Sequence, residues 1–138
     1  MAEKKLPFEG LRVCDFSWYA AGPVATKYLA DHGAQVIKME YSGRPDNIRV
    51  SMPKTPGKEQ SLNTGGWFND MNSSKLCLGL NLAHPRASEV YHRLILVSDI
   101  VVENFSPRIK EGLGLNYEDY AKLKPDLIWV DQPMQGLT

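Results

Sequence analysis

An excess of either charge and a long hydrophobic run are both missing from this sequence of 138 residues. Its 16 lysines and arginines balance 16 aspartates and glutamates, whereas general nucleic-acid binding needs a basic surface. No segment approaches the roughly 18 consecutive apolar residues of a membrane span, and the N-terminus lacks the apolar core of a signal peptide. We therefore expect a cytoplasmic domain that binds neither nucleic acid nor a membrane.

Cysteine and histidine are also scarce. Cys14 and Cys77 lie far apart, each inside an apolar run, which predicts small buried side chains and not a metal motif. Of the three histidines, His32 falls at a predicted helix end, His84 at a helix start and His92 on a helix face. None has a partner nearby in sequence, so we expect structural histidines and no metal site.

The sequence does contain an alternation of strand and helix patterns. Short apolar runs predict strands, and apolar residues at helical spacing predict the helices between them. The strands are expected at 11–16, 34–40, 75–81, 99–103 and 127–130, and the helices at 22–32, from Pro85, at 106–112 and at 116–122. This order predicts an α/β fold with a Rossmann-like, mostly parallel sheet and helices on both faces, as the N-terminal part of a larger domain.

Residues 41–66 interrupt the alternation with Gly, Pro, Lys, Ser and Asn. Loops of this length inside compact domains are usually functional, so the segment is a candidate lid or ligand-flanking loop. The alternative interpretation is a disordered excursion.

Two phosphate-binding motifs are absent. Glu40 ends the second predicted strand, where a ribose-binding acid would stand, but the first turn offers only Gly22 in place of the three glycines of Gly-x-Gly-x-x-Gly. No Gly-x-x-x-x-Gly-Lys-Ser/Thr occurs either. NAD, FAD and P-loop nucleotide binding are therefore not expected.

Several short sequence motifs occur in a fixed order along nearly the whole chain, and their combination is more informative than any single one. They are 7–16 (PFEGLRVCDF), 21–23 (AGP), 29–40 (LADHGAQVIKME), 72–82 (NSSKLCLGLNL), 99–105 (DIVVENF) with Pro107, and 112–115 (GLGL) with 124–128 (KPDLI). Together they resemble the class III coenzyme A transferases, a family that includes formyl-CoA transferase, carnitine CoA-transferase and the 2-methylacyl-CoA racemases.

The resemblance implies a CoA cleft at the strand ends, with coenzyme A or acyl-CoA as substrate and no prosthetic group. Its implied binding residues are Trp18, Tyr19, Ala20 and Ala21 around the pantetheine, Tyr41 near the adenine, Leu80, Asn104 and Phe105 at nucleotide-contacting positions, and Arg108. Many members have a basic residue where Tyr41 stands, and some have an arginine where Gly112 stands. An aromatic ring stacks on a base but does not neutralise phosphate, so the phosphate contacts stay open.

Each implied contact has a simpler alternative. Trp18 and Phe105 are large apolar groups that more often pack in a core. Asn104 is a possible cap for the helix near Pro107, and Lys75 a possible solvated charge at a strand edge.

The resemblance also implies the chemistry. In the family an aspartate attacks the acyl-CoA thioester, and CoA and the acceptor carboxylate resolve the acyl-enzyme. That aspartate is expected downstream of residue 138, so the predicted catalytic set within this chain is empty. Asp131 is the substitute by position, but a strand-end turn residue is the better interpretation, and Asp15 and Glu103 lie inside strands.

We therefore interpret residues 1–138 as the incomplete, N-terminal CoA-binding portion of a CoA-transferase that is inactive alone and homodimeric when whole. Two alternatives remain open, a 2-methylacyl-CoA racemase-like enzyme and a non-catalytic CoA-binding module. A fragment of this kind is expected to expose apolar surface or to associate.

Overall fold

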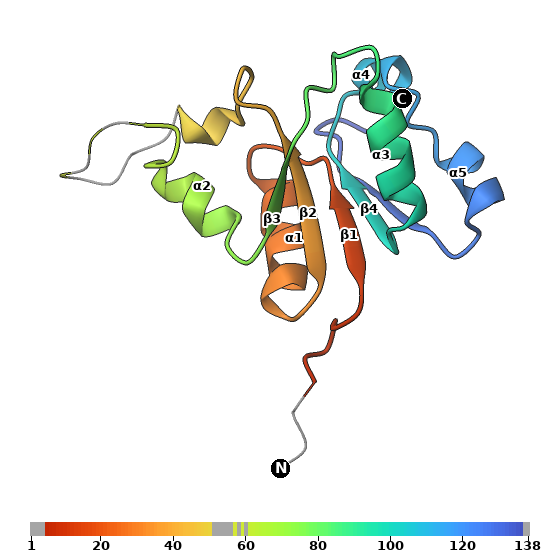
Figure 1. The fold of residues 1–138 in the computed structure, drawn as a ribbon, viewed down its shortest axis with the longest axis horizontal. Coiled ribbons are helices and arrows are strands. Elements are labelled where there is room, and N and C mark those ends of the chain that lie inside the picture. The colour runs from red at the N-terminus through yellow and green to blue at the C-terminus, as the bar shows by residue number, and fades with distance from the viewer. Residues whose placement is uncertain (1–4, 51–56, 58, 60, 137–138) are drawn as a thin grey trace.

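A computed structural model describes residues 5–50, 57, 59 and 61–136. Five strands form one sheet in the order β3-β2-β1-β4-β5 (Figure 1). All four neighbouring pairs are parallel, which confirms the predicted α/β class and the parallel sheet. The strands are β1 (Arg12–Asp15), β2 (Gln35–Glu40), β3 (Leu76–Gly79), β4 (Ile100–Glu103) and β5 (Ile128–Asp131).

Helices cover both faces of the sheet, as predicted. In Figure 1, α1 lies behind the central strands and α3 lies in front of them. The helices are α1 (Ala21–Asp31), α2 (Gly66–Met71), α3 (Ala87–Leu96), α4 (Pro107–Gly112) and α5 (Tyr117–Leu123), with a 3-10 helix η1 (Asn47–Arg49). Gly33 follows α1 with φ +107, a left-handed conformation that a glycine adopts without steric cost.

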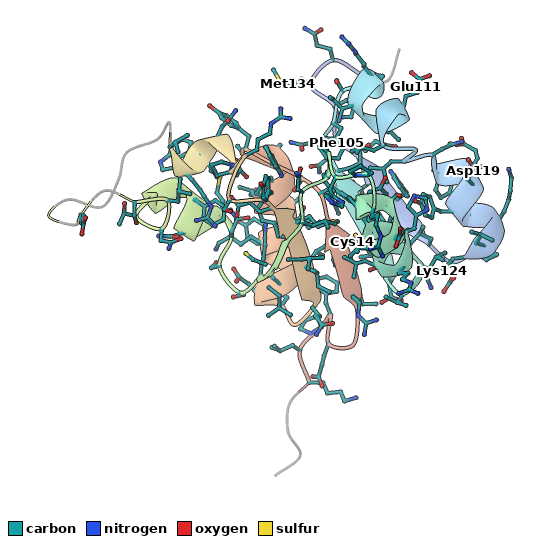
Figure 2. All side chains as sticks on the ribbon, turned by 45° about the horizontal axis from the view of Figure 1, so that its top comes forward. Cys14, Phe105, Glu111, Asp119, Lys124 and Met134 are labelled. Atoms are coloured by element: carbon teal, nitrogen blue, oxygen red, sulfur yellow. The ribbon has the colours of Figure 1, made fainter. Side chains whose placement is uncertain are left out.

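The core has one layer on each side of the sheet. Alternation along β1 sends Val13 into a cluster with Ala30 and Val36 and sends Cys14 into a cluster with Tyr91 and Ile95 of α3. Figure 2 shows Cys14 in the interior beside α3, and places at the periphery Asp119 on α5 and Lys124 directly after that helix. Burying apolar side chains on both faces is what stabilises a sheet of such short strands.

Several details differ from the sequence predictions. Cys14 is buried as expected, but the prediction of a buried Cys77 is wrong, because β3 is an edge strand and leaves this thiol exposed. Helix α2 was not predicted. The segment 41–66 contains a bridge between Tyr41 and Arg44 and the helix η1, and part of it lies outside the described residues. None of the described helices is both long and apolar enough to cross a membrane.

Candidate functional site

The turns after β1 and β4 meet at the carboxyl edge of the sheet. The chain moves from β1 to β2 and β3 on one side, and places β4 and β5 on the other, so the strand order reverses between β1 and β4. In open parallel sheets this switch point is where ligands bind. The candidate site is therefore built from the residues that follow these strands.

A side chain joins the two turns. Asn104 Oδ1 accepts a hydrogen bond from the Trp18 N–H at 2.9 Å, and Asn104 Nδ2 donates to the Trp18 carbonyl at 2.7 Å. The N-cap of α4 is Ser106, so Asn104 does not serve as the cap. The structure thus brings together Trp18 and Asn104, two residues that the sequence analysis had placed in one cleft.

The Trp18–Tyr19 turn has a strained backbone. Tyr19 has φ +70, a left-handed conformation that costs a non-glycine residue on the order of 1–2 kcal/mol. Its N–H donates to both carboxylate oxygens of Asp46, at 3.1 and 3.2 Å. Ala20 and Ala21 follow at the start of α1, where Ala20 is the N-cap residue. Asp46 thus reaches from the segment after β2 to hold the turn after β1.

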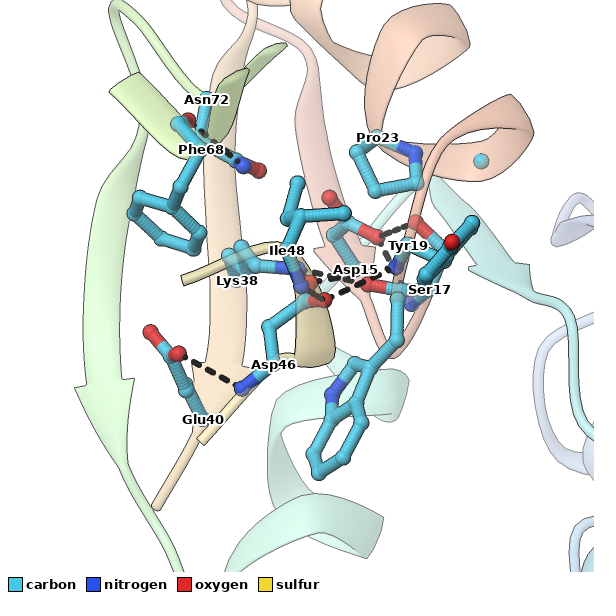
Figure 3. A network of polar contacts seen from close by, with 12 residues as sticks. Asp15, Ser17, Tyr19, Pro23, Lys38, Glu40, Asp46, Ile48, Phe68 and Asn72 are labelled. Carbon is cyan, nitrogen blue, oxygen red and sulfur yellow. Dashed lines mark hydrogen bonds and ion pairs between the residues drawn. The ribbon is translucent and has the colours of Figure 1, made fainter. Parts of the chain in front are cut away.

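A buried ion pair fixes Asp46 (Figure 3). Lys38 Nζ lies 3.2 Å from Asp46 Oδ2 and 2.6 Å from the Ser17 carbonyl, and both charged side chains are fully buried. Asp46 Oδ1 also accepts from the Ile48 N–H at 3.3 Å. Every charged atom of this pair has a partner, so the pair leaves no unsatisfied charge in the dry interior.

A second buried carboxylate supports the same turn. Asp15 accepts hydrogen bonds from the N–H and Oγ of Ser17, at 2.9 and 2.5 Å, and from Thr26 Oγ1 at 2.6 Å. Lys75 Nζ lies 3.2 Å from Asp15 and 2.9 Å from Asn72 Oδ1. The suggestion that Lys75 is a solvated edge charge is wrong, since its side chain is fully buried. Burial lowers the pKa of Lys75 to about 8, while the charge of Asp15 opposes this shift.

Close packing at Gly22 completes the turn. A Cβ atom at Gly22 would lie 2.2 Å from Ser17 Cβ and 3.2 Å from Gln132 Oε1. Real Cβ atoms do not approach so closely, so glycine is required here to let α1 begin against the end of β1.

Next to the switch point, an ion pair orders the segment after β2. Arg49 binds Glu40 through Nε and Nη2, at 2.6 and 2.8 Å, and its guanidinium lies 3.3 Å from the centre of the Phe68 ring. Burial acts to raise the pKa of Glu40, but the hydrogen bonds from Arg49 and the Asp46 N–H, together with the nearby positive charges, outweigh burial, and the pKa is lowered. A cavity of about 220 Å³ lies beside this pair, and its lining includes Cys77 and Asn63.

The other predicted binding residues lie around this edge. Tyr41 and Leu80 directly follow β2 and β3, and the Leu80 N–H donates to the Glu40 carbonyl at 2.9 Å. The Phe105 ring packs edge-on against Phe16, with centroids 6.2 Å apart, so Phe105 belongs partly to the core. Arg108 is exposed on α4. Which of these residues contact a ligand stays a prediction.

A third buried carboxylate closes the end of β4. Glu103 Oε2 accepts from the Phe105 N–H at 2.7 Å, and Lys110 Nζ lies 3.4 Å from Oε1. Glu103 lies beside Asp131 of β5 in the sheet register, and Lys110 also pairs with Asp131. Burial, with the neighbouring Asp131, raises the pKa of Glu103 to about 7. Burial acts to raise the pKa of Asp131, but its hydrogen bonds with Glu103 and Lys110 act more strongly together, and the pKa is lowered.

Sequence reasoning placed Asp15 and Glu103 inside strands without giving them a role in shaping the site, and it did not single out Asp46. Asp15, Asp46 and Glu103 each accept an N–H two residues further along the chain, and an acidic residue at a strand end or turn is the available sequence signal. Within the described part of the chain, no group of three or more His, Cys, Asp or Glu side chains is arranged to hold a metal ion.

Known proteins resemble this chain in sequence. It is 35% identical to the acetyl-CoA:oxalate CoA-transferase of Acetobacter aceti over 137 residues, which are 99% of this chain and 34% of that protein. It is 33% identical to the human succinyl-CoA:glutarate CoA-transferase over 132 residues, 96% of this chain and 29% of that protein.

Solved structures agree with this likeness. Rv3272 from M. tuberculosis superposes with a TM-score of 0.80 at 32% identity, over 94% of this chain and 35% of that one. A CAIB/BAIF family protein from Brucella suis gives a TM-score of 0.79 at 28% identity, over 93% and 33%. The chain thus spans about a third of the length of these relatives. The model of CoA-transferase family III matches residues 8–138, and the chain belongs to that family.

Proposed function

We propose that this chain forms the CoA-binding portion of an enzyme that moves coenzyme A between an acyl-CoA thioester and a carboxylic acid. The observation that carries this proposal is the joined turn at the switch point, where Asn104 bonds both backbone groups of Trp18. Loops fixed in this way at strand ends form the ligand crevice of open parallel sheets. Relatives named for oxalate and glutarate suggest a small dicarboxylic acid as the acceptor.

The reaction we propose proceeds through an acyl-aspartyl intermediate. Such a nucleophile needs a carboxylate that is accessible and not already paired. At this edge Asp15 and Asp46 are buried against lysines, Glu103 is buried, and Asp131 pairs with Lys110. The occupation of these carboxylates supports a nucleophile that comes from outside residues 1–138. As a further part of the proposal, the whole enzyme is a cytoplasmic homodimer.

Calorimetric titration with CoA tests the binding function. The 138-residue chain is expected to bind CoA, and Asn104→Ala to weaken the affinity about tenfold, because both hydrogen bonds to Trp18 are lost. Asn69→Ala is the matched control, since Asn69 is exposed on α2 and its side chain donates to the Asn63 carbonyl, away from Trp18. Failure of the unsubstituted chain to bind CoA would overturn the proposal.

Activity separates a transferase from the alternatives. The whole polypeptide, where its coding sequence extends beyond Thr138, is expected to exchange CoA between succinyl-CoA and glutarate or oxalate. Inversion of a 2-methylacyl-CoA without exchange would identify a racemase, and CoA binding without either reaction would identify a non-catalytic module.

A further inference from the structure

Arg44 is a cation held at the site by a short turn. It follows β2, and the Arg44 N–H donates to the Tyr41 carbonyl at 3.0 Å, which closes a bridge between the two residues. Gly43 lets the Tyr41 ring fold onto this turn, because a Cβ there would lie 2.6 Å from the ring. Arg44 and the Tyr41 ring are therefore fixed on one small turn at the carboxyl edge of the sheet.

The Arg44 side chain reaches the switch point. Its guanidinium carbon lies 5.9 Å from the centre of the Trp18 ring, within the range of a cation–π contact. Trp18 is itself fixed by Asn104 and by a hydrogen bond from its Nε1 to the Met39 carbonyl at 3.4 Å. The charge of Arg44 thus belongs to the candidate cleft.

This charge has no carboxylate partner. The two acidic residues nearest in sequence are already paired, Glu40 with Arg49 and Asp46 with Lys38. Among the described residues no carboxylate lies within ion-pair distance of Arg44, whose side chain is exposed. Since other cations occupy the neighbouring acids, the guanidinium is left to bind an external anion.

We propose that Arg44 is the residue of this cleft that binds a phosphate group of the CoA nucleotide. A guanidinium in cation–π contact with an aromatic ring keeps its N–H donors available, and they match two oxygens of a phosphate. The exposed Tyr41 ring on the same turn offers a face to the adenine. This inference rests on the proposed CoA-binding function. In it, Arg44 provides close to Tyr41 the positive charge that the Tyr41 side chain does not have.

The test compares ligands that carry phosphate with one that lacks it. Arg44→Gln is expected to weaken binding of CoA and of adenosine 3′,5′-bisphosphate about tenfold, through loss of a charge-assisted hydrogen bond, and to leave binding of pantetheine unchanged. Arg44→Lys keeps the charge without the planar donors, so it is expected to retain part of the affinity. Dephospho-CoA, which lacks the 3′-phosphate, then shows which phosphate Arg44 binds. A loss of affinity that persists with dephospho-CoA assigns Arg44 to the diphosphate, and a loss that disappears assigns it to the 3′-phosphate.

Arg93→Gln is the matched control. Arg93 is exposed in the last turn of α3, away from the carboxyl edge of the sheet, so the same loss of charge is expected to change no affinity. Equal CoA affinity of Arg44→Gln and the parent would overturn the inference and leave the proposed function intact. Equal losses of affinity for CoA and for pantetheine would overturn the inference as well. No CoA binding by the parent would overturn the proposed function itself.

Discussion

At the scale of single residues, buried charges hold the binding turn in place. The Lys38–Asp46 pair is completely buried and joins three segments, because Asp46 also accepts the Tyr19 N–H and Lys38 also binds the Ser17 carbonyl. A buried pair adds little net stability over apolar residues of the same size. Its effect here is on conformation, since it keeps Tyr19 in a backbone state that Tyr19 does not favour.

Removal of one charge of the Lys38–Asp46 pair tests how strongly its two members depend on each other. Asp46→Asn is expected to lower the free energy of unfolding by about 3 kcal/mol, because the Lys38 ammonium stays buried without a carboxylate. Lys38→Met in the same background is expected to recover part of the loss. Urea unfolding of the parent, the two single variants and the double variant gives the coupling energy.

The exposed Arg86–Glu89 pair provides the control for this cycle. Glu89→Gln removes the same kind of charge from a pair in contact with water and is expected to leave the unfolding midpoint unchanged. Strict additivity of the Lys38 and Asp46 substitutions would show that the buried pair is not coupled.

Sequence alone could not supply these pairings. Lys38 and Asp46 are eight residues apart but on different segments, and Asp15 and Lys75 are separated by sixty. Such contacts depend on how loops cross the sheet edge, which hydrophobic periodicity does not encode. The resemblance to a family did place Trp18 and Asn104 in one cleft, and the structure joins them directly.

At the scale of elements, the strands and most of the helices follow from the sequence pattern, whereas helix α2 and the exposure of β3 do not. Helix α2 has six residues, too few for an amphipathic repeat to be distinguished from a loop. Strand β3 was predicted, but its exposure was not, because an apolar run looks the same in an edge strand and in a central one. The exposed Cys77 is a direct consequence.

The paired ends of β4 and β5 predict a pH dependence of stability. The pKa of Glu103 rises from 4.5 to about 7 on folding. Between these values the folded chain binds more protons than the unfolded chain, so the contribution of Glu103 to the free energy of unfolding falls as pH rises through this window. The lowered pKa of Asp131 acts in the opposite direction at more acidic pH, where stability is lost as Asp131 protonates.

Glu103→Gln isolates this effect, because the amide keeps the shape of the protonated acid and does not titrate. The stability of the variant relative to the parent is expected to increase from about pH 4.5 to about pH 7 and then to level off. Urea unfolding across this range measures the difference. A difference that stays constant with pH would show that Glu103 titrates alike in both states.

At the scale of the whole molecule, the strand and helix sequence predicted the parallel sheet, but the order β3-β2-β1-β4-β5 comes from the structure. This order leaves β3 and β5 as the two open edges. Each edge strand exposes a large apolar side chain, with Leu76 of β3 55% exposed and Ile128 of β5 57% exposed. The described chain therefore carries apolar surface at both ends of its sheet.

Unpaired strand edges with apolar side chains favour association with other chains. Sedimentation of the 138-residue chain is expected to show concentration-dependent association, and the double variant Leu76→Glu, Ile128→Glu to reduce it, because a charge on each edge disfavours strand pairing. Tyr28→Glu is the matched control, since Tyr28 is exposed on α1 and lies on no sheet edge. A compact monomer with one cooperative melt at all concentrations would contradict this prediction. It would mean that strand edges as short as β3 and β5 resist pairing despite their exposed apolar side chains.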